Sequence, residues 1–307
     1  FFDLPMLKPQ VRIVLRNCGF VDPEDIDQYL ALDGYRGLIN ALKMSPEDVI
    51  GVVRQAGLRG RGGAGFPTFK KWTVCRNSPG EQKYLICNAD EGDPGAFMNR
   101  SLIESDPHAL LEGMLIAGYA IGASKGIIYI RAEYPLAIER LKKAIGQMRE
   151  YGLLGNKILD SDFSFDVKIK EGAGAFVCGE ETALIQSMEG KRGEPRNKPP
   201  FPTQAGFKNM PTVVNNVETL ASALMVFKIG PKEFKKLGIQ DSHGSKLFSV
   251  SGDTPKPGIY DLEFGLSLAE FVEEFGDGDT KAVQVGGASG FCVPRKKFAE
   301  TTIGYQG

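Results

Sequence analysis

Short apolar runs alternate with longer segments of helical periodicity through most of this 307-residue sequence. The runs have the length of single strands, which predicts strands at 84–87, 127–130 and 163–170. Elsewhere apolar residues recur every three or four positions, which predicts helices at 106–121, 135–148, 180–188 and 216–227. A helix between two strands carries the chain back across the sheet, so this order favours parallel strands. The sequence therefore predicts an α/β fold with a mostly parallel sheet.

The two ends of the chain differ from this central part. Residues 1–44 lack sustained periodicity and are expected to form an arm or connector. Residues 45–240 are expected to form the α/β domain, Rossmann-like, with helices on both faces of the sheet. Short strands surround one helix near Ser267, so residues 241–307 predict a small α+β module. The chain starts at Phe1 and stops within a patterned region, and we expect it to be a segment of a longer polypeptide.

Charge and cysteine content exclude several classes of function. A formal charge of −1 gives no field for binding nucleic acid or an acidic membrane surface. The longest apolar stretch, at 110–130, is interrupted by glycines and charged residues and predicts no transmembrane helix. The five cysteines are scattered without a C-x-x-C pair, so local spacing builds no zinc or iron–sulfur site here. We expect reduced thiols in a soluble, cytoplasmic protein.

A glycine-rich stretch at 57–67 contains G-x-G-x-x-G at Gly60, Gly62 and Gly65. A dinucleotide fingerprint needs a strand before it and a helix after it. Here a helix is predicted before it, and Pro67 is expected to obstruct the helix after it. We predict a loop whose backbone approaches a flat or phosphorylated ligand, with a tight connector as the alternative. Charge for such a ligand would come from Arg59, Arg61, Lys70 and Lys71.

Three more segments carry candidate ligand contacts. The run Asn-Ala-Asp-Glu-Gly-Asp-Pro-Gly at 88–95 follows a predicted strand, where open α/β sheets bind ligands, and its carboxylates suit sugar or ribityl hydroxyls. Its alternative is a solvated turn. Residues 172–182 run from glycines into the start of a helix that bears two acidic residues. The N-terminus of this helix is expected either to attract an anion or to have its dipole satisfied by the two acidic residues themselves. The proline-rich loop at 191–207 is a linker or a stiff clamp for a nucleotide.

Four long motifs, in order, resemble those of one known family. They are GLRGRGGAGFPT at 57–68, YLICNADEGDPG at 84–95, GAGAFVCGEETALIQS at 172–187 and NNVETLAS at 215–222. The sequence is thereby similar to the flavoprotein (51 kDa type) subunit that oxidises NADH in NADH dehydrogenases, including respiratory complex I. The same module serves NAD(P)-linked [FeFe]-hydrogenases and NAD-linked formate dehydrogenases. The arm RIVLRNCG at 12–19 resembles the hydrogenase branch more closely.

The resemblance implies an FMN site beside a site for NAD(H). The positions that match FMN contacts are Gly60, Arg61, Gly62, Lys71, Asn88, Asp90, Glu91, Gly179, Glu180, Val214, Asn215 and Asn216. The positions that match the nicotinamide nucleotide site are Phe66, Asp93, Glu181, Lys198 and Phe201. This sequence departs from the family at Phe176, usually a tyrosine, at Asp93, usually a glutamate, and at Val74, which replaces an aromatic residue. The departures bear mainly on the adenosine half of the nucleotide site.

The implied activity is hydride transfer between NAD(H) and FMN, followed by one-electron transfer to iron–sulfur clusters. The flavin carries the chemistry, so no catalytic acid or base is expected among the side chains. Carboxylates beside the site would repel a 2′-phosphate, which favours NAD over NADP. The alternatives are the complex I or formate dehydrogenase version of this subunit, and a non-redox nucleotide-binding module on the same fold.

The resemblance also implies further parts and partners. Residues 241–307 resemble the start of a soluble-ligand-binding, ubiquitin-like β-grasp module. The family's C-x-x-C-x-x-C run is absent from these residues, so a helical bundle holding a [4Fe–4S] cluster is expected beyond Gly307. The expected partners are iron–sulfur subunits, including a thioredoxin-like [2Fe–2S] subunit and a hydrogenase catalytic subunit.

Overall fold

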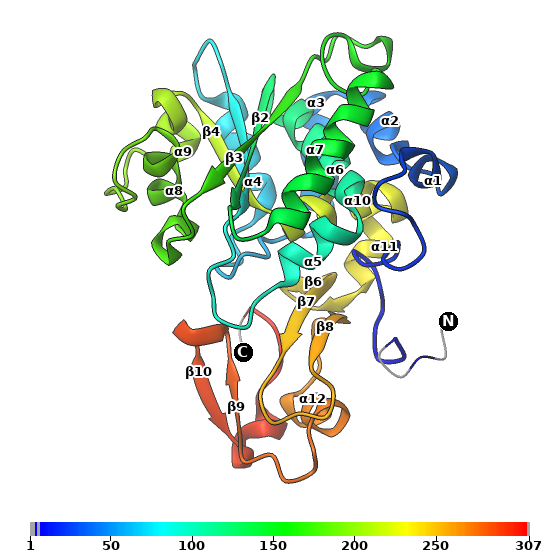
Figure 1. The fold of residues 1–307 in the computed structure, drawn as a ribbon, viewed down its shortest axis with the longest axis vertical. Coiled ribbons are helices and arrows are strands. Elements are labelled where there is room, and N and C mark those ends of the chain that lie inside the picture. The colour runs from blue at the N-terminus through cyan, green and yellow to red at the C-terminus, as the bar shows by residue number, and fades with distance from the viewer. Residues whose placement is uncertain (1–3, 5–6, 306–307) are drawn as a thin grey trace.

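The computed structural model describes residue 4 and residues 7–305. Figure 1 shows a helix-covered sheet in the upper part of the molecule and a smaller lobe beneath it. The sheet has four parallel strands in the order β3-β2-β1-β4. Their bounds are β1 (Tyr84–Ala89), β2 (Lys125–Arg131), β3 (Asp166–Gly172) and β4 (Thr212–Asn216). The predicted α/β fold with a parallel sheet is confirmed.

The helices begin at capping residues that the sequence offers. The Ser45 hydroxyl accepts from the Asp48 amide at 3.1 Å, and Gly57 ends the same helix in the left-handed conformation that glycine tolerates. Asp106 likewise accepts from the Ala109 amide at 3.2 Å. The helices are α1 (Ile26–Ala31), α2 (Arg36–Leu42), α3 (Pro46–Ala56), α4 (Thr68–Asn77), α5 (Met98–Ser105), α6 (Pro107–Ile121), α7 (Pro135–Glu150), α8 (Glu181–Met188), α9 (Pro202–Ala205), α10 (Val217–Ile229), α11 (Pro231–Lys236) and α12 (Leu268–Phe275).

Side chains are buried on both faces of the sheet. Alternate residues of a strand point to opposite faces, so Leu85 and Cys87 join the large core that contains α6, α7 and α10. Tyr84 and Ile86 join a second core with Leu184 of α8. Helices therefore cover both faces, as a parallel sheet requires.

Two sequence predictions in this region need correction. Strand β4 was not predicted. The helix expected from residue 216 is α10, which begins at Val217 because the side chain of Asn216 caps it. The strand expected at 163–170 joins the sheet only from Asp166. Phe165 pairs with Gly155 in an isolated antiparallel bridge, which holds the preceding residues outside the sheet.

A fully buried carboxylate attaches the N-terminal segment to the core. Glu112 of α6 accepts hydrogen bonds from the Tyr29 hydroxyl at 2.5 Å, the Tyr35 amide at 2.9 Å and the Leu38 amide at 3.1 Å. The two carboxylate oxygens of Glu112 thereby satisfy buried hydrogen-bond donors on α1 and at the start of α2. The N-terminal part is thus packed against α6 through buried polar contacts.

The second attachment of the N-terminal segment lies on the smaller lobe. Asp261 of β8 (Gly258–Glu263) is fully buried and accepts from the amides of Val14 at 2.8 Å and Leu15 at 3.2 Å. Burial is the main cause that raises its pKa from an ordinary 3.8 to about 6. The folded protein therefore binds a proton here more tightly than the unfolded chain does.

This shift predicts how Asp261→Asn changes the pH dependence of stability. Below about pH 4 the carboxyl is protonated in both states, whereas above about pH 6 the folded protein must bury the charge. The free energy of unfolding of the wild type, measured relative to the variant, should fall between these values by on the order of 3 kcal/mol. Urea unfolding of both proteins from pH 4 to 7.5 measures this difference. A difference that stays constant with pH would refute the prediction.

The smaller lobe consists of short antiparallel pairs around one helix. β7 (Ser245–Val250) pairs with β8, and β9 (Ala282–Val285) pairs with β10 (Phe291–Pro294). A third pair, β5 (Gly238–Ile239) with β6 (Ser242–His243), precedes them. Helix α12 starts after Ser267, as the sequence predicted. The Ser267 hydroxyl accepts a hydrogen bond from the Glu270 amide at 3.2 Å.

Candidate functional site

The separate motifs of the sequence meet at the carboxyl edge of the sheet. β1 and β4 are neighbours, and Asn88 lies opposite Asn216 at their carboxyl ends. The side-chain Nδ2 of Asn88 donates to the Gly179 carbonyl at 2.9 Å, which joins the 172–182 segment to this edge. The strand order reverses between β1 and β4, the position at which doubly wound sheets bind ligands. The segments after β1 and β4 and the 172–182 segment therefore meet at one edge of the sheet.

The glycine-rich loop closes on itself before reaching the sheet edge. The Gly60 amide donates to the Phe66 carbonyl at 2.9 Å, and a Cβ at Gly62 would lie 3.2 Å from the Cβ of Asn216. The preceding segment is helix α3, as predicted. The expectation that Pro67 obstructs a following helix is wrong, since α4 starts directly after it. Proline is tolerated there because the first helical residues need no amide donor.

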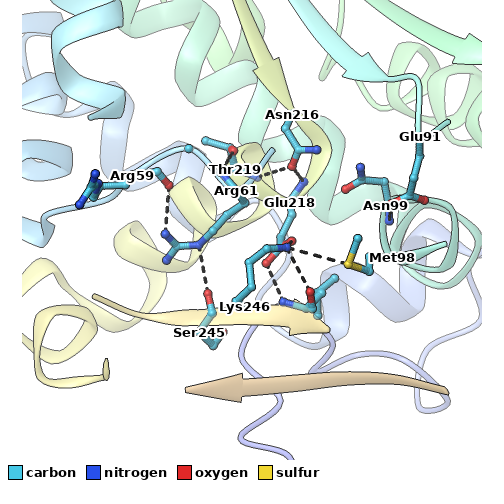
Figure 2. Close-up of polar contacts among 12 residues, drawn as sticks. Arg59, Arg61, Glu91, Met98, Asn99, Asn216, Glu218, Thr219, Ser245 and Lys246 are labelled. Atoms are coloured by element: carbon cyan, nitrogen blue, oxygen red, sulfur yellow. Dashed lines mark hydrogen bonds and ion pairs between the residues drawn. The ribbon is translucent and has the colours of Figure 1, made fainter. Parts of the chain in front are cut away.

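The Arg61 side chain points away from this edge and toward the smaller lobe (Figure 2). It is 3% exposed and donates to the carbonyls of Ser245 at 3.0 Å and His243 at 2.6 Å, and to the Tyr305 hydroxyl at 3.0 Å. Its amide donates to the Thr219 hydroxyl of α10 at 2.8 Å. The guanidinium therefore fastens the lobe to the loop. The guanidinium donors of Arg61 are already taken by carbonyl and hydroxyl acceptors. At this position the glycine-rich loop therefore contributes its backbone, rather than the arginine charge, to the candidate site.

Glu181 lies between two lysines at the start of α8. Its carboxylate is 2.8 Å from Nζ of Lys71 and 2.8 Å from Nζ of Lys198. Burial opposes ionisation, but the two ammonium groups outweigh it and lower the pKa of Glu181 below its ordinary value. Lys71 also donates to the Val214 carbonyl at 3.0 Å, so this cluster links α4, α8 and β4.

Glu180 caps helix α8 rather than projecting freely. Its carboxylate accepts from the amides of Thr182 at 2.8 Å and Ala183 at 3.1 Å, and lies 3.1 Å from Nζ of Lys198. Burial raises the pKa of Glu180, but these partners lower it further, so the net direction is downward. The two glutamates thus have different neighbours, although they are adjacent in sequence.

The acidic turn after β1 leaves two buried oxygens without partners among the described residues. Glu91 accepts from the amides of Asn99 at 3.0 Å and Arg100 at 3.3 Å, which satisfies the N-terminus of α5. Asp90 Oδ1 lies 3.1 Å from an Arg131 nitrogen, whereas Oδ2 has no hydrogen-bond partner. Asp93 Oδ1 is buried and unpaired as well. Both oxygens can therefore accept a hydrogen bond from a donor that is not part of the described residues.

Three phenylalanines near this edge are exposed to solvent. The exposed fractions are 51% for Phe66 in the glycine-rich loop, 60% for Phe176 before α8 and 50% for Phe201 before α9. Large apolar rings are usually buried, and an exposed ring face suits stacking on a flat ligand. The sequence singled out Phe66 through the family resemblance, and Phe201 also through its place in the proline-rich loop at 191–207.

Two residues at this edge were missed by the sequence analysis. The indole of buried Trp72 donates to Asn215 Oδ1 at 2.8 Å and fixes that side chain. Arg131 ends β2 between the turns that follow β1 and β3. A lone cation at the end of an apolar strand was the available signal for Arg131. For Trp72 the sequence carried no such signal, because its partner is 143 positions away.

Within the described residues no helix is long and apolar enough to cross a bilayer. The same residues contain no group of three or more histidine, cysteine or acidic side chains arranged to hold a metal ion.

Comparison with known proteins places the chain in a flavin-binding family. The Nuo51 FMN-binding domain matches residues 53–224, more than half of the chain, and the chain belongs to this family. The chain is 53% identical to the NADP-reducing hydrogenase subunit HndC of Solidesulfovibrio fructosivorans, over 97% of this chain and 62% of that subunit. It is 48% identical to an NADH-quinone oxidoreductase subunit of Rhizobium meliloti (strain 1021), over 92% of this chain and 68% of that protein.

Comparison with solved structures also finds a hydrogenase among proteins of similar fold. The fold is similar to an NAD+-reducing [NiFe]-hydrogenase in the H2-reduced state, with a TM-score of 0.80 and 41% identity. That alignment covers 87% of this chain and 46% of the hydrogenase chain. The chain thus spans only part of the proteins that it matches, 62% of HndC and 45% of the alpha subunit of the Cupriavidus necator hydrogenase HoxS.

Proposed function

We propose that this chain binds FMN at the carboxyl edge of its sheet and supports hydride transfer between NAD(H) and that flavin. The observation that carries this proposal is the buried, unpaired Asp90 oxygen in the turn after β1, at the sheet edge where Asn88 lies opposite Asn216 and Gly62 approaches Asn216. Such an acceptor fits a ligand with N–H or O–H donors. Membership of the Nuo51 FMN-binding domain family supports FMN as that ligand.

The residues at this edge fit the chemistry of FMN. The phosphate is an anion, which suits loop amides and the Lys71 ammonium. Lys71 holds Glu181 and the Val214 carbonyl, and an ammonium has three donors, so one donor remains for a ligand. Asp90 Oδ2 provides an acceptor for a ribityl hydroxyl or a ring N–H group. When bound, FMN supplies the two-electron chemistry that the side chains lack.

The neighbouring residues suit a nicotinamide dinucleotide. The exposed rings of Phe66 and Phe201 offer stacking surfaces, and Lys198 offers a cation for a phosphate group. Glu181 and Asp93 are acceptors for ribose hydroxyls. Both would repel a 2′-phosphate, so we propose NAD in preference to NADP. The protein then holds the two rings in place and provides no acid or base for the hydride step.

We also propose the wider setting of this chain. Relatives named as hydrogenase and NADH-quinone oxidoreductase subunits support a place in a cytoplasmic complex with iron–sulfur partners. Among these, the 53% identity to HndC over 97% of this chain favours the hydrogenase version. The boundaries at 44 and 240, the β-grasp nature of residues 241–307, and a cluster-bearing bundle beyond Gly307 are part of this proposal.

The test is reconstitution followed by reduction. The purified chain is incubated with FMN, desalted and examined for flavin absorbance at about 450 nm. NADH is then added in the absence of oxygen. We expect retained flavin that loses this absorbance on adding NADH. A folded chain that retains no FMN would refute the proposed function. A chain that retains FMN but is not reduced by NADH would instead support the non-redox nucleotide-binding alternative.

Replacing Glu181 by glutamine tests the division of the site between FMN and NADH. The change removes the charge that both lysines pair with but keeps an acceptor oxygen. We expect normal FMN content and a KM for NADH raised about tenfold, which corresponds to about 1.4 kcal/mol. Flavin content and NADH reduction kinetics are the measurements. If only the melting temperature changes, Glu181 merely complements the helix dipole.

A further inference from the structure

A single cation lies between the two turns that border the candidate site. Arg131 is the last residue of β2, the strand next to β1, and is only 9% exposed. Its guanidinium lies 3.1 Å from Asp90 in the turn after β1, and 2.6 Å from Glu133. The side chain of Asp90 is fully buried, whereas that of Glu133 is 62% exposed. The contact with Asp90 is therefore shielded from water, whereas the contact with Glu133 is open to it.

Two glycines make room for this guanidinium. A Cβ at Gly92 would lie 2.7 Å from Nη1 of Arg131 and 3.2 Å from the Cα of Phe176. A Cβ at Gly174 would lie 3.1 Å from Nη2. The turns after β1 and β3 therefore both close directly over Arg131. Any larger residue at Gly92 would displace either the guanidinium or the backbone before α8.

The contact with Arg131 leaves one oxygen of Asp90 free. Oδ1 accepts from Nη1, and Oδ2 is buried with no hydrogen-bond partner among the described residues. Nε and Nη2 of Arg131 both bind Glu133, at 2.7 and 2.6 Å, and because the guanidinium is planar and rigid this fork fixes the direction in which Nη1 meets Asp90. Burial raises the pKa of Asp90, and the Arg131 cation opposes this rise and so favours the charged form, in which Oδ2 is the stronger acceptor.

We propose that Arg131 is a positioning residue for the flavin site, which orients Asp90 so that its free oxygen accepts a hydrogen bond from bound FMN. This inference rests on the proposed function, but it assigns a role to a residue outside the set of expected contacts. Arg131 acts through Asp90 and touches no ligand itself. The close approach of its guanidinium also accounts for glycine at position 92.

The experiment measures FMN binding by a double-mutant cycle. The apoprotein is titrated with FMN, and flavin fluorescence gives Kd for the wild type, Arg131→Gln, Asp90→Asn and the double variant. We expect Arg131→Gln to raise Kd about tenfold, the loss typical of one charge-assisted hydrogen bond. In the Asp90→Asn background, Arg131→Gln should have no further effect on Kd, because its partner is already neutral.

Two further variants make the outcome specific. Arg131→Lys keeps the charge but loses the fork, so its Kd should lie between those of the wild type and Arg131→Gln. Arg149→Gln is the matched control, since Arg149 pairs with Asp166 at 2.9 Å at the opposite, amino end of the sheet. This pair is about half exposed, and Kd should not change.

The inference fails under either of two results. Equal Kd values for the wild type, Arg131→Gln and Arg131→Lys would overturn it, whatever happens to the melting temperature. Effects of Arg131→Gln and Asp90→Asn that multiply in the double variant would also overturn it. Should Arg131→Gln fail to fold, Arg131→Lys alone and with Asp90→Asn carries the same test. If the wild type itself binds no FMN, the proposed function falls with it.

Discussion

Replacement of Glu112 by leucine is expected to lower the free energy of unfolding by about 4 kcal/mol or more. Three buried donors lose their acceptor at once, namely the Tyr29 hydroxyl and the amides of Tyr35 and Leu38. Each unsatisfied buried donor costs about 1–3 kcal/mol, which exceeds what the apolar side chain gains on burial. Urea unfolding followed by circular dichroism measures the change.

Glu139→Leu is the matched control, because Glu139 is an exposed residue of α7. Its effect should stay within about 0.5 kcal/mol. Glu112→Gln should fall between the two, since an amide oxygen still accepts one or two of the bonds. A loss of less than about 1 kcal/mol for Glu112→Leu would mean that the N-terminal segment does not depend on this carboxylate.

The layers of the fold follow from local sequence signals. The apolar face of α7 was predicted from its spacing, and the residues buried there are Ala137, Ile138, Leu141, Ala144, Ile145 and Met148. Caps such as Ser45 and Asp106 fixed helix starts because the capping bond spans only a few residues. Strand β4 was missed because it has five residues, ends in two asparagines and runs straight into α10.

The location of the candidate site was predictable in a similar way. Carboxyl ends of parallel strands meet at one edge, so motifs that follow strands converge without knowledge of distant contacts. Side-chain direction was not predictable for Arg61, because its acceptors Ser245 and His243 lie more than 180 positions away. Nor could the sequence show that Asp90 shares its carboxylate with Arg131, which depends on the neighbouring strand.

Replacement of Glu218 by alanine is expected to lower the free energy of unfolding by about 3–5 kcal/mol. Glu218 is 1% exposed and pairs with Lys246, whose side chain is 17% exposed (Figure 2). It also accepts from the Leu247 amide at 2.8 Å. The variant would leave a nearly buried ammonium and an amide without their acceptor, which is the costly way to break a buried pair.

The position of Glu218 extends this loss to the candidate site. It lies in the first turn of α10, where Asn216 caps the helix and Thr219 accepts from the Arg61 amide. Strand β7 carries both Lys246 and Ser245, the carbonyl acceptor of the Arg61 side chain. The lobe, α10 and the glycine-rich loop therefore share one set of contacts, and Glu218→Ala should weaken FMN retention as well as stability.

Two comparisons show whether the buried pair is the cause. Glu233→Ala breaks an exposed pair, with side chains 59% and 70% exposed, and should change stability by less than about 0.5 kcal/mol. The double variant Glu218→Leu with Lys246→Met removes both charges, so it should recover much of the loss seen with Glu218→Ala. The melting temperature is measured for all three variants, and it should fall by about 10 °C for Glu218→Ala. A double variant that melts below Glu218→Ala would show that packing at this junction, rather than the unpaired ammonium of Lys246, sets the cost.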